Sequence, residues 1–582
     1  MQLLGFMLLS GVLFFIAYRI IGRRLAQMFK LDATAITPAH EQRDGLDFEP
    51  ARTSVLLPQH FSAIAAAGPV VGPIAAGLLF GWGPAWIWIL IGSIFIGGIH
   101  DFTALLASIR HKARSVAEIV RQYMNPRAYV LFLIFVWSAL IYVVIAFTDV
   151  TASTFASAAT GPAVASSSIM YLGLAIAMGF AQRYWKVKPL IAKFVFLPLV
   201  FLAIYLGPQL PFNLAGIFPD TPGGVQKMWG FALLGYCLFA AMAPVWSLLQ
   251  PRGELGGYFL YIVMILGVGG IVVGAFSGTL EITQPFFKGW NAPDPIGVFG
   301  GVTPVFPILF ITVACGACSG FHSIVASGTT SKQLDRETDA KPIAYGGMML
   351  EGFFACLSLA TFMVFVAGPG KSGNPDGIYA LGISDFGKRL LGPFATDAAG
   401  AVLYQFALLC FATFVFDTLD ACTRLARYIL MELAGWNHRG HAWLATIISL
   451  AIPVIAIALP PLELAGKPQP LWKVFWNIFG SSNQLLAALT LLSVSVWMAR
   501  KHMNYWIALV PTLFMMSMTL WSLWLMATPH IGLYEKWAEL ETIRHFQFAI
   551  IVSLLALTFW LILEAVITWR SIYRERRKVV AS

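Results

Sequence analysis

About fifteen long apolar segments run through the sequence, and a membrane-spanning helix needs roughly 20 mostly apolar residues. Of the 582 residues, 58% are apolar and 11% are charged, whereas soluble domains carry roughly 25% charged residues. The pattern predicts an all-α polytopic membrane protein in a lipid bilayer. The segments cover approximately 2–18, 60–80, 84–109, 128–147, 167–181, 190–207, 229–249, 256–278, 304–328, 342–367, 396–430, 442–460, 473–498, 504–526 and 547–569.

Basic residues gather in alternate loops between these segments. Most of the 38 Lys and Arg residues lie on the inner side if the N-terminus is placed outside. Because cytoplasmic loops carry an excess of Lys and Arg, we expect a periplasmic N-terminus and a cytoplasmic C-terminus. The net charge of +10 then belongs to membrane topology and does not indicate a nucleic-acid partner.

The segment 60–80 contains residues that interrupt helices. Residues 67–77 read "AGPVVGPIAAG" and include Gly68, Pro69, Gly72 and Pro73. Proline removes a backbone donor, and in hydrocarbon each freed backbone group needs another partner. We therefore predict a discontinuous helix, with its backbone opened between Gly68 and Pro73 and facing a cavity inside the protein.

Residues 311–330, "ITVACGACSGFHSIVASGTT", form a second interrupted segment. Gly316 and Gly320 repeat the four-residue spacing of Gly68 and Gly72. Small residues at this spacing also form packing seams between helices, which need no transport site. The second segment, however, adds polar side chains at membrane depth: Ser319, His322, Ser327, Thr329 and Thr330.

The two interrupted segments occupy matching places in the chain. Each begins a set of five segments, in the predicted units 60–207 and 304–498, and the charge pattern gives the sets opposite orientations. Two inserted helices fall in 208–303, while 1–59 supplies a helix and a loop and 499–582 supplies two helices and a basic tail. This five-plus-five inverted repeat is typical of secondary transporters that bind their solute near the bilayer midplane.

His100, Asp101 and Glu351 are among the ionisable residues that lie within apolar segments. An ionisable residue inside a membrane segment is a candidate for ion coupling. His100 and Asp101 also fit an interfacial position near Arg110, and Glu351 fits a structural partner of a neighbouring helix. Both alternatives stay open from the sequence.

Two further clusters are polar. Asp420 and Arg424 are four residues apart, so we expect an ion pair within one helix, with Asp417 one turn deeper as a candidate for a cation or proton. Asn483 and Gln484 begin a long apolar segment, where amides either bind a solute or cross-link helices.

No metal or other cofactor is predicted. His60, His100 and His322 would form a metal site only if three ligands converged. Cys315 and Cys318 form a C-x-x-C pattern that also fits small residues at a helix contact. The sequence lacks nucleotide-binding and metalloprotease motifs, which argues against ATP-driven transport and against an enzyme.

Several blocks resemble one family. They read "DGLDFEP", "HFSAIAAAGPVVGPIAAG", "HDF", "VACGACSGFHSIVASGTTSKQL", "FDTLDACTRLARYIL" and "IFGSSNQLLAALTLL", and they resemble the signature blocks of the carbon starvation protein A (CstA) family. The resemblance implies a bacterial inner-membrane transporter with a LeuT-like core. Members import peptides during carbon starvation or take up pyruvate with protons. Many members carry glutamine at the position of His100, and typical members have a larger C-terminal region.

Together these features predict a secondary active importer of a small solute, coupled to a proton or to sodium. The predicted solute site lies between the two interrupted segments. Its residues are Gly68, Gly72, Gly316, Ser319, Gly320, His322, Ser327, Thr329, Thr330, Asn483 and Gln484, with Asp101, Glu351, Asp417 and His100 for ion coupling. A sodium-coupled amino-acid-type symporter, a channel and a nutrient sensor are the alternatives, and the oligomeric state stays open.

Overall fold

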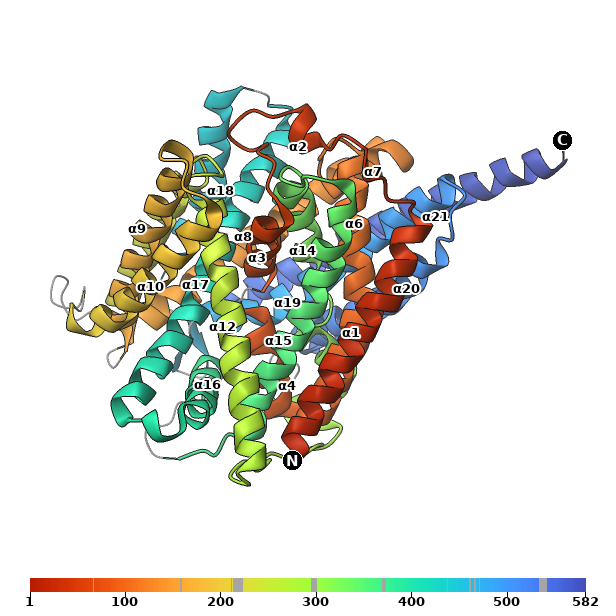
Figure 1. Ribbon diagram of the computed structural model, residues 1–582. Coiled ribbons are helices and arrows are strands. Elements are labelled where there is room, and N and C mark those ends of the chain that lie inside the picture. The colour runs from red at the N-terminus through yellow and green to blue at the C-terminus, as the bar shows by residue number, and fades with distance from the viewer. Residues whose placement is uncertain are drawn as a thin grey trace.

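The computed structural model is almost entirely helical (Figure 1). It describes residues 1–581 except 66, 158–159, 211, 213–222, 295–300, 369–372, 437, 460–461, 465–466, 470 and 533–541. Parts of the predicted insertion 208–303 therefore lie outside the described residues. Two short antiparallel strand pairs, one pairing Asn291 with Pro304 and the other Leu462 with Gln469, accompany the helices.

The elements follow one another along the chain in three groups. The first group contains α1 (Gln2–Met28), α2 (Pro38–Glu41), α3 (Thr53–Ile64), α4 (Gly68–Phe80), α5 (Trp82–Gly92), the π-helix η1 (Ser93–Gly97), α6 (Gly98–Arg110), α7 (Val116–Tyr123), α8 (Pro126–Ala156), α9 (Gly161–Tyr184), α10 (Pro189–Leu206) and η2 (Gly207–Gln209). The second contains α11 (Gly224–Ala240), α12 (Leu249–Phe276), β1 (Asn291–Pro293), β2 (Val302–Pro304), α13 (Val305–Thr312), α14 (Gly320–Val325), η3 (Ala326–Thr330), η4 (Glu337–Asp339), η5 (Lys341–Tyr345), α15 (Gly346–Met363) and α16 (Pro375–Leu391). The third contains η6 (Gly392–Phe394), α17 (Asp397–Ala434), α18 (Arg439–Ala458), β3 (Leu462–Leu464), β4 (Lys467–Gln469), α19 (Leu471–Arg500), α20 (Trp506–Gly532) and α21 (Thr542–Ala581).

Within the described residues, 12 helices are long and apolar enough to cross a membrane, and counting the bent pair α3–α4 as one span raises this to 13. The predicted segments 229–249 and 304–328 coincide with shorter elements. They are α11 with 17 residues and α13 with 8 residues, the latter followed by a non-helical stretch and by α14. The polytopic helical class is confirmed, and the count of about fifteen stays a prediction.

Both predicted discontinuous helices are present. α3 and α4 meet at an angle of 40°, and α13 and α14 are separated by residues 313–319. The expected opening between Gly68 and Pro73 is wrong, because α4 already begins at Gly68 and the break precedes it. Pro69 lies in the first turn of α4, where a backbone donor has no partner within the helix, so it begins the helix and does not open it.

The two broken helices touch at their glycines. A Cβ atom on Gly68 would lie 2.2 Å from Cβ of Cys315, and one on Gly72 would lie 2.7 Å from the carbonyl oxygen of Thr312. Real Cβ atoms do not approach other atoms this closely, so both positions require glycine in the observed packing. The observed contacts of these glycines match the packing-seam interpretation.

Helix α12, one of the two helices predicted to be inserted, packs along α3, and Figure 1 shows it running beside α3 and α15. A Cβ on Gly257 of α12 would lie 2.3 Å from the carbonyl oxygen of Pro58. Helix α12 therefore contacts the first broken helix directly.

Candidate functional site

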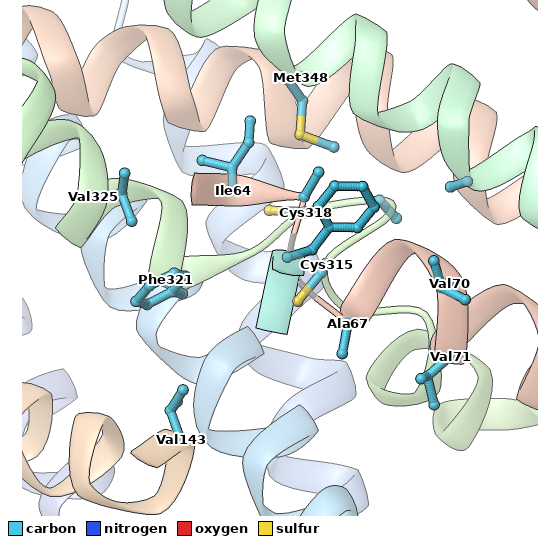
Figure 2. Close-up of a cluster of buried hydrophobic side chains, with 14 of the residues drawn as sticks. Ile64, Ala67, Val70, Val71, Val143, Cys315, Cys318, Phe321, Val325 and Met348 are labelled. Atoms are coloured by element: carbon cyan, nitrogen blue, oxygen red, sulfur yellow. The ribbon is translucent and has the colours of Figure 1, made fainter. Parts of the chain in front are cut away.

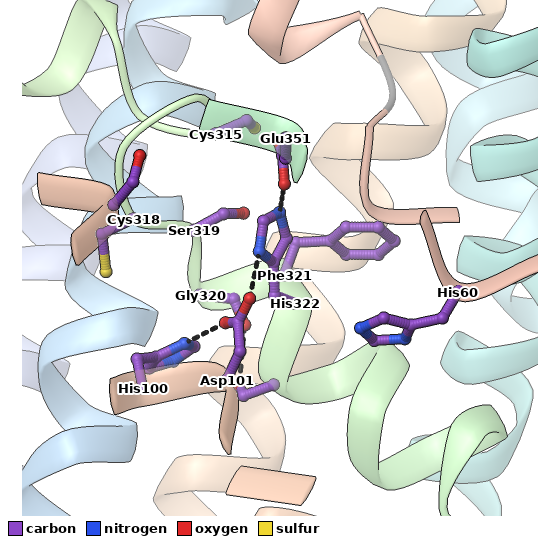
Figure 3. Close-up of polar contacts among 12 residues, drawn as sticks. His60, His100, Asp101, Cys315, Cys318, Ser319, Gly320, Phe321, His322 and Glu351 are labelled. Carbon is purple, nitrogen blue, oxygen red and sulfur yellow. Dashed lines mark hydrogen bonds and ion pairs between the residues drawn. The ribbon is translucent and has the colours of Figure 1, made fainter. Parts of the chain in front are cut away.

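Four ionisable side chains meet beside the second broken helix (Figure 3). Nδ1 of His322, on α14, lies 2.9 Å from Oδ2 of Asp101 on α6, and its Nε2 lies 3.2 Å from Oε2 of Glu351 on α15. The other oxygen of Asp101, Oδ1, lies 2.7 Å from Nδ1 of His100. All four side chains are 0% exposed. The structure thus brings together three of the four predicted coupling residues and one predicted solute-site residue.

The hydrogen bonds limit where protons can be. An ionised carboxylate only accepts, so with Asp101 ionised the Nδ1 atoms of both His100 and His322 carry hydrogens. On the other side of the His322 ring, Nε2 faces the carboxylate of Glu351. A favourable contact there requires one proton, either on Nε2 or on Glu351. The pair is therefore a place where one proton can be held.

The third histidine of interest, His60, has a different partner. Its Nδ1 lies 2.9 Å from the hydroxyl oxygen of Thr330, and in Figure 3 the His60 ring lies apart from the bonds that join His100, Asp101 and His322. Among the described residues, no group of three or more His, Cys, Asp or Glu side chains has the arrangement of a metal site.

Side chains of α19 satisfy the irregular backbone of the second broken helix. Oδ1 of Asn483 accepts the backbone N–H of Phe321 at 2.8 Å, and its Nδ2 donates to the hydroxyl of Ser319 at 3.0 Å. Nε2 of Gln484 donates to the carbonyl oxygen of Cys318 at 2.9 Å. Both predicted amides therefore support the broken segment, as buried backbone groups require.

Helix α5 and η1 also donate hydrogen bonds to this segment. The hydroxyl of Ser93 donates to the carbonyl oxygen of Gly316 at 3.0 Å, and the indole N–H of Trp88 donates to the carbonyl oxygen of Val313 at 3.1 Å. Sequence reasoning missed both residues, because a single Ser and a single Trp in an apolar segment carry no distinguishing pattern.

Of the remaining predicted residues, Gly320 begins α14 at the break, whereas Ser327, Thr329 and Thr330 lie beyond α14 in η3. The Thr329 hydroxyl donates to the carbonyl oxygen of Val325 within its own helix, and Ser327 is buried beside it. A Cβ atom built on Gly320 would lie 2.4 Å from the backbone nitrogen of Ala487, so the start of α14 packs directly against α19. Apolar side chains surround the break, as Figure 2 shows for Ile64, Val70, Val71, Val143, Phe321 and others.

The expected ion pair between Asp420 and Arg424 is wrong. Asp420 accepts hydrogen bonds from Arg252 and from Tyr236, and Arg424 pairs with Asp47 at 2.9 Å. Spacing along one helix made the two residues neighbours, but tertiary partners from other segments outcompete that contact. Arg252 also donates to Asp417, the third predicted carboxylate.

A loop between α1 and α3 covers the end of α17 and the loop after η3. The Thr37 hydroxyl donates to the carbonyl oxygen of Leu334 at 2.6 Å, and Asp47 pairs with Arg424. Lys332 lies over the ring of Tyr428, with Nζ 3.6 Å from its centroid. Burial lowers the pKa of Lys332 to about 8, although the nearby Asp47 carboxylate opposes the shift.

A cavity of about 320 Å³ adjoins the first turn of α4, where Val71 lines it. Its lining residues come from α4, α8, α11, α16, α17 and α19, and they include Val71, Thr154, Gln226, Asp376, Tyr404 and Trp476. None of the described residues that line it is Lys or Arg, and Asp376 is acidic. The volume is that of a small-molecule site.

Comparisons with known proteins agree with this architecture. Residues 3–375 and 370–522 match the family described as "Carbon starvation protein CstA". The chain is 33% identical over 580 residues to the peptide transporter CstA of Escherichia coli, covering 88% of this chain and 80% of that protein. It is 29% identical over 606 residues to the pyruvate/proton symporter BtsT of the same organism, with the same two coverages.

A solved structure shares the fold. The manganese transporter of Eremococcus coleocola, in complex with an aromatic bis-isothiourea substituted compound, superposes with a TM-score of 0.51 at 13% identity. The match covers 90% of this chain and 99% of that transporter. The predicted LeuT-like fold class is confirmed, and the protein is a multi-pass membrane transporter. On the family match and on the sequence identity to its curated members, the chain belongs to the carbon starvation protein CstA family.

Proposed function

We propose that the protein imports small organic solutes, peptides or pyruvate, across the bacterial inner membrane, and that the uptake is coupled to protons. One observation supports the coupling most strongly: His322 lies between the carboxylates of Asp101 and Glu351, fully buried, at the break of the second discontinuous helix. Buried ionisable residues inside membrane segments mark proton pathways. The two relatives carry peptides and pyruvate, as their names state.

The coupling follows from where the proton is held. With a proton between Nε2 of His322 and Glu351, the contact joins α14 to α15. Without it, a ring lone pair faces a carboxylate, which is repulsive, so the contact between α14 and α15 is weakened. Because residues 313–319 connect α14 to the contact with Gly68 and Gly72, the proton state acts on both broken helices.

The solute would reach the broken helices through the cavity that Val71 and Asp376 line. In this proposal the solute site that includes Gly316 and Ser319 lies at the inner end of that route. We further propose a periplasmic N-terminus and a cytoplasmic C-terminus, since that orientation puts most basic residues in the cytoplasm. The cavity would then open toward the periplasm.

Uptake into proteoliposomes tests this function. Purified protein is reconstituted, and accumulation of labelled pyruvate and labelled dialanine is measured with an inward proton gradient, with an inward sodium gradient and with neither. We expect accumulation above the external concentration under the proton gradient, and its loss when a protonophore is added. Equilibration without accumulation under every gradient would indicate a channel, and binding without uptake would indicate a sensor.

A further inference from the structure

Arg252 lies between two carboxylates of a neighbouring helix. From the first turn of α12, its guanidinium donates to Asp417 and to Asp420 on α17, and it lies 4.9 Å from the ring centroid of Phe416. The side chain is 1% exposed. The hydroxyl of Tyr236, on α11, also belongs to this cluster. It accepts a hydrogen bond from Nη1 of Arg252 at 2.6 Å and donates one to Asp420 at 2.7 Å.

The same cluster includes the first broken helix. The hydroxyl of Ser62, on α3, donates to Oδ2 of Asp417. A Cβ on Gly256 of α12 would lie 2.5 Å from Oγ of Ser62 and 2.8 Å from Oδ2 of Asp417, so α12, α3 and α17 meet at this point. The guanidinium therefore occupies the junction of the first broken helix with α17.

The oxygen atoms at this junction would suit a metal cation. Two carboxylates and a hydroxyl are hard oxygen ligands, and buried carboxylates inside a membrane require a cation. Arginine keeps its charge at every physiological pH, so it supplies that cation permanently. Arg424 follows Asp420 by one helical turn but pairs with Asp47, so Arg252 is the cation that both carboxylates contact.

We propose that Arg252 takes the place of a sodium ion between α3 and α17, so that the cycle needs no sodium and removal of the guanidinium creates a sodium-binding site. The claim that the transport cycle needs no sodium rests on the proposed function. The claim that removal of the guanidinium creates a sodium-binding site, called the binding half below, concerns the folded protein alone. It also gives the inserted helix α12 a role, which is to carry the cation to the transport core.

Thermal unfolding in detergent tests the binding half. The apparent unfolding midpoint is measured in sodium chloride, potassium chloride and choline chloride at equal ionic strength, for the wild type, Arg252→Ala and Arg252→Lys. We expect the wild type and Arg252→Lys to respond equally to the three salts. Arg252→Ala should unfold at a lower temperature in choline and regain about 2 °C or more in sodium, since a ligand bound only to the folded state stabilises it.

Two results would overturn the inference: sodium-specific stabilisation of the wild type, or an Arg252→Ala midpoint that is the same in all three salts. Should Arg252→Ala fail to fold, Arg252→Gln is measured in the same three salts, with the same result expected, and uptake in sodium against choline medium repeats the wild-type comparison. We expect wild-type uptake to differ by less than about twofold between these media. Absence of proton-driven uptake would refute the proposed function and leave the salt response of Arg252→Ala as the separate test of the cation site.

Discussion

Nε2 of His322 lies 3.2 Å from Oε2 of Glu351, and both side chains are completely buried. Nδ1 of the same ring is hydrogen-bonded to Asp101, so a flip of the imidazole ring would break that hydrogen bond. We propose that a proton held between His322 and Glu351 strengthens the contact of α14 with α15, and that its loss weakens this contact.

Asn483→Ala should destabilise the second broken helix. The substitution removes the acceptor of the Phe321 backbone N–H and the partner of Ser319. A buried polar group left without a partner costs about 1–3 kcal/mol. We expect a lower unfolding midpoint and a strong loss of uptake. Ser493→Ala on the same helix is the matched control, since that hydroxyl donates only to the carbonyl oxygen of Leu489. Equal effects of the two substitutions would contradict the supporting role of Asn483.

Gly72→Ala should separate the two broken helices. The added Cβ would lie 2.7 Å from the Thr312 carbonyl oxygen and 3.3 Å from Cα of Val313, both backbone atoms that cannot rotate away. We expect uptake to fall at least about tenfold, because overpacking forces backbone shifts. Gly235→Ala on α11 is the control, because its Cβ would meet no atom within 4 Å. Normal uptake by Gly72→Ala would show that this contact is dispensable.

Lys332 should make stability depend on pH in the alkaline range. Its pKa is about 8 in the folded protein, against 10.5 for an unperturbed lysine. Between these values the unfolded chain binds more protons than the folded one, so the Lys332 contribution to stability rises with pH from about 8 to about 10.5. We expect Lys332→Met to flatten this rise in the unfolding midpoint. Parallel wild-type and variant curves would refute the lowered pKa of Lys332 in the folded protein.

Asp376 should favour solutes that carry an ammonium group. The cavity that it lines has no Lys or Arg among its described lining residues. We expect Asp376→Asn to raise KM for dialanine about fivefold, corresponding to about 1 kcal/mol for a partly exposed ion pair, and to leave KM for pyruvate unchanged. Ser157→Ala, in the same cavity, should affect neither solute. An equal loss of affinity for pyruvate would exclude this selectivity.

Much of the fold could be predicted from the sequence, because lipid leaves the backbone few options and apolar segments must become helices. The polar residues of the candidate centre were also visible, since His322, Asp101 and Glu351 lie in segments where such residues are costly. The exact break was harder to predict. Pro69 disfavours a helix interior but suits a helix start, and the sequence does not distinguish the two positions.

Arg252 could not be predicted because its partners are distant. Asp417 is 165 residues away along the chain, and Arg252 lies at the edge of an apolar segment where basic residues usually face water. Local spacing favoured Asp420 with Arg424, and the two residues instead bond to Arg252 and Asp47. Tertiary contacts of this kind follow from how helices pack, which no single segment encodes.

The most direct test of proton coupling is Glu351→Gln, with exchange and accumulation measured on the same proteoliposomes. Glutamine keeps the shape of a protonated glutamate but cannot release a proton. We expect exchange of labelled for unlabelled solute to persist, and accumulation driven by the proton gradient to fall at least about tenfold. Ser358→Ala, on the same helix, should leave both intact, since its hydroxyl donates only to the carbonyl oxygen of Phe354. Proton-driven accumulation by Glu351→Gln at the wild-type level would contradict the role of the His322–Glu351 pair.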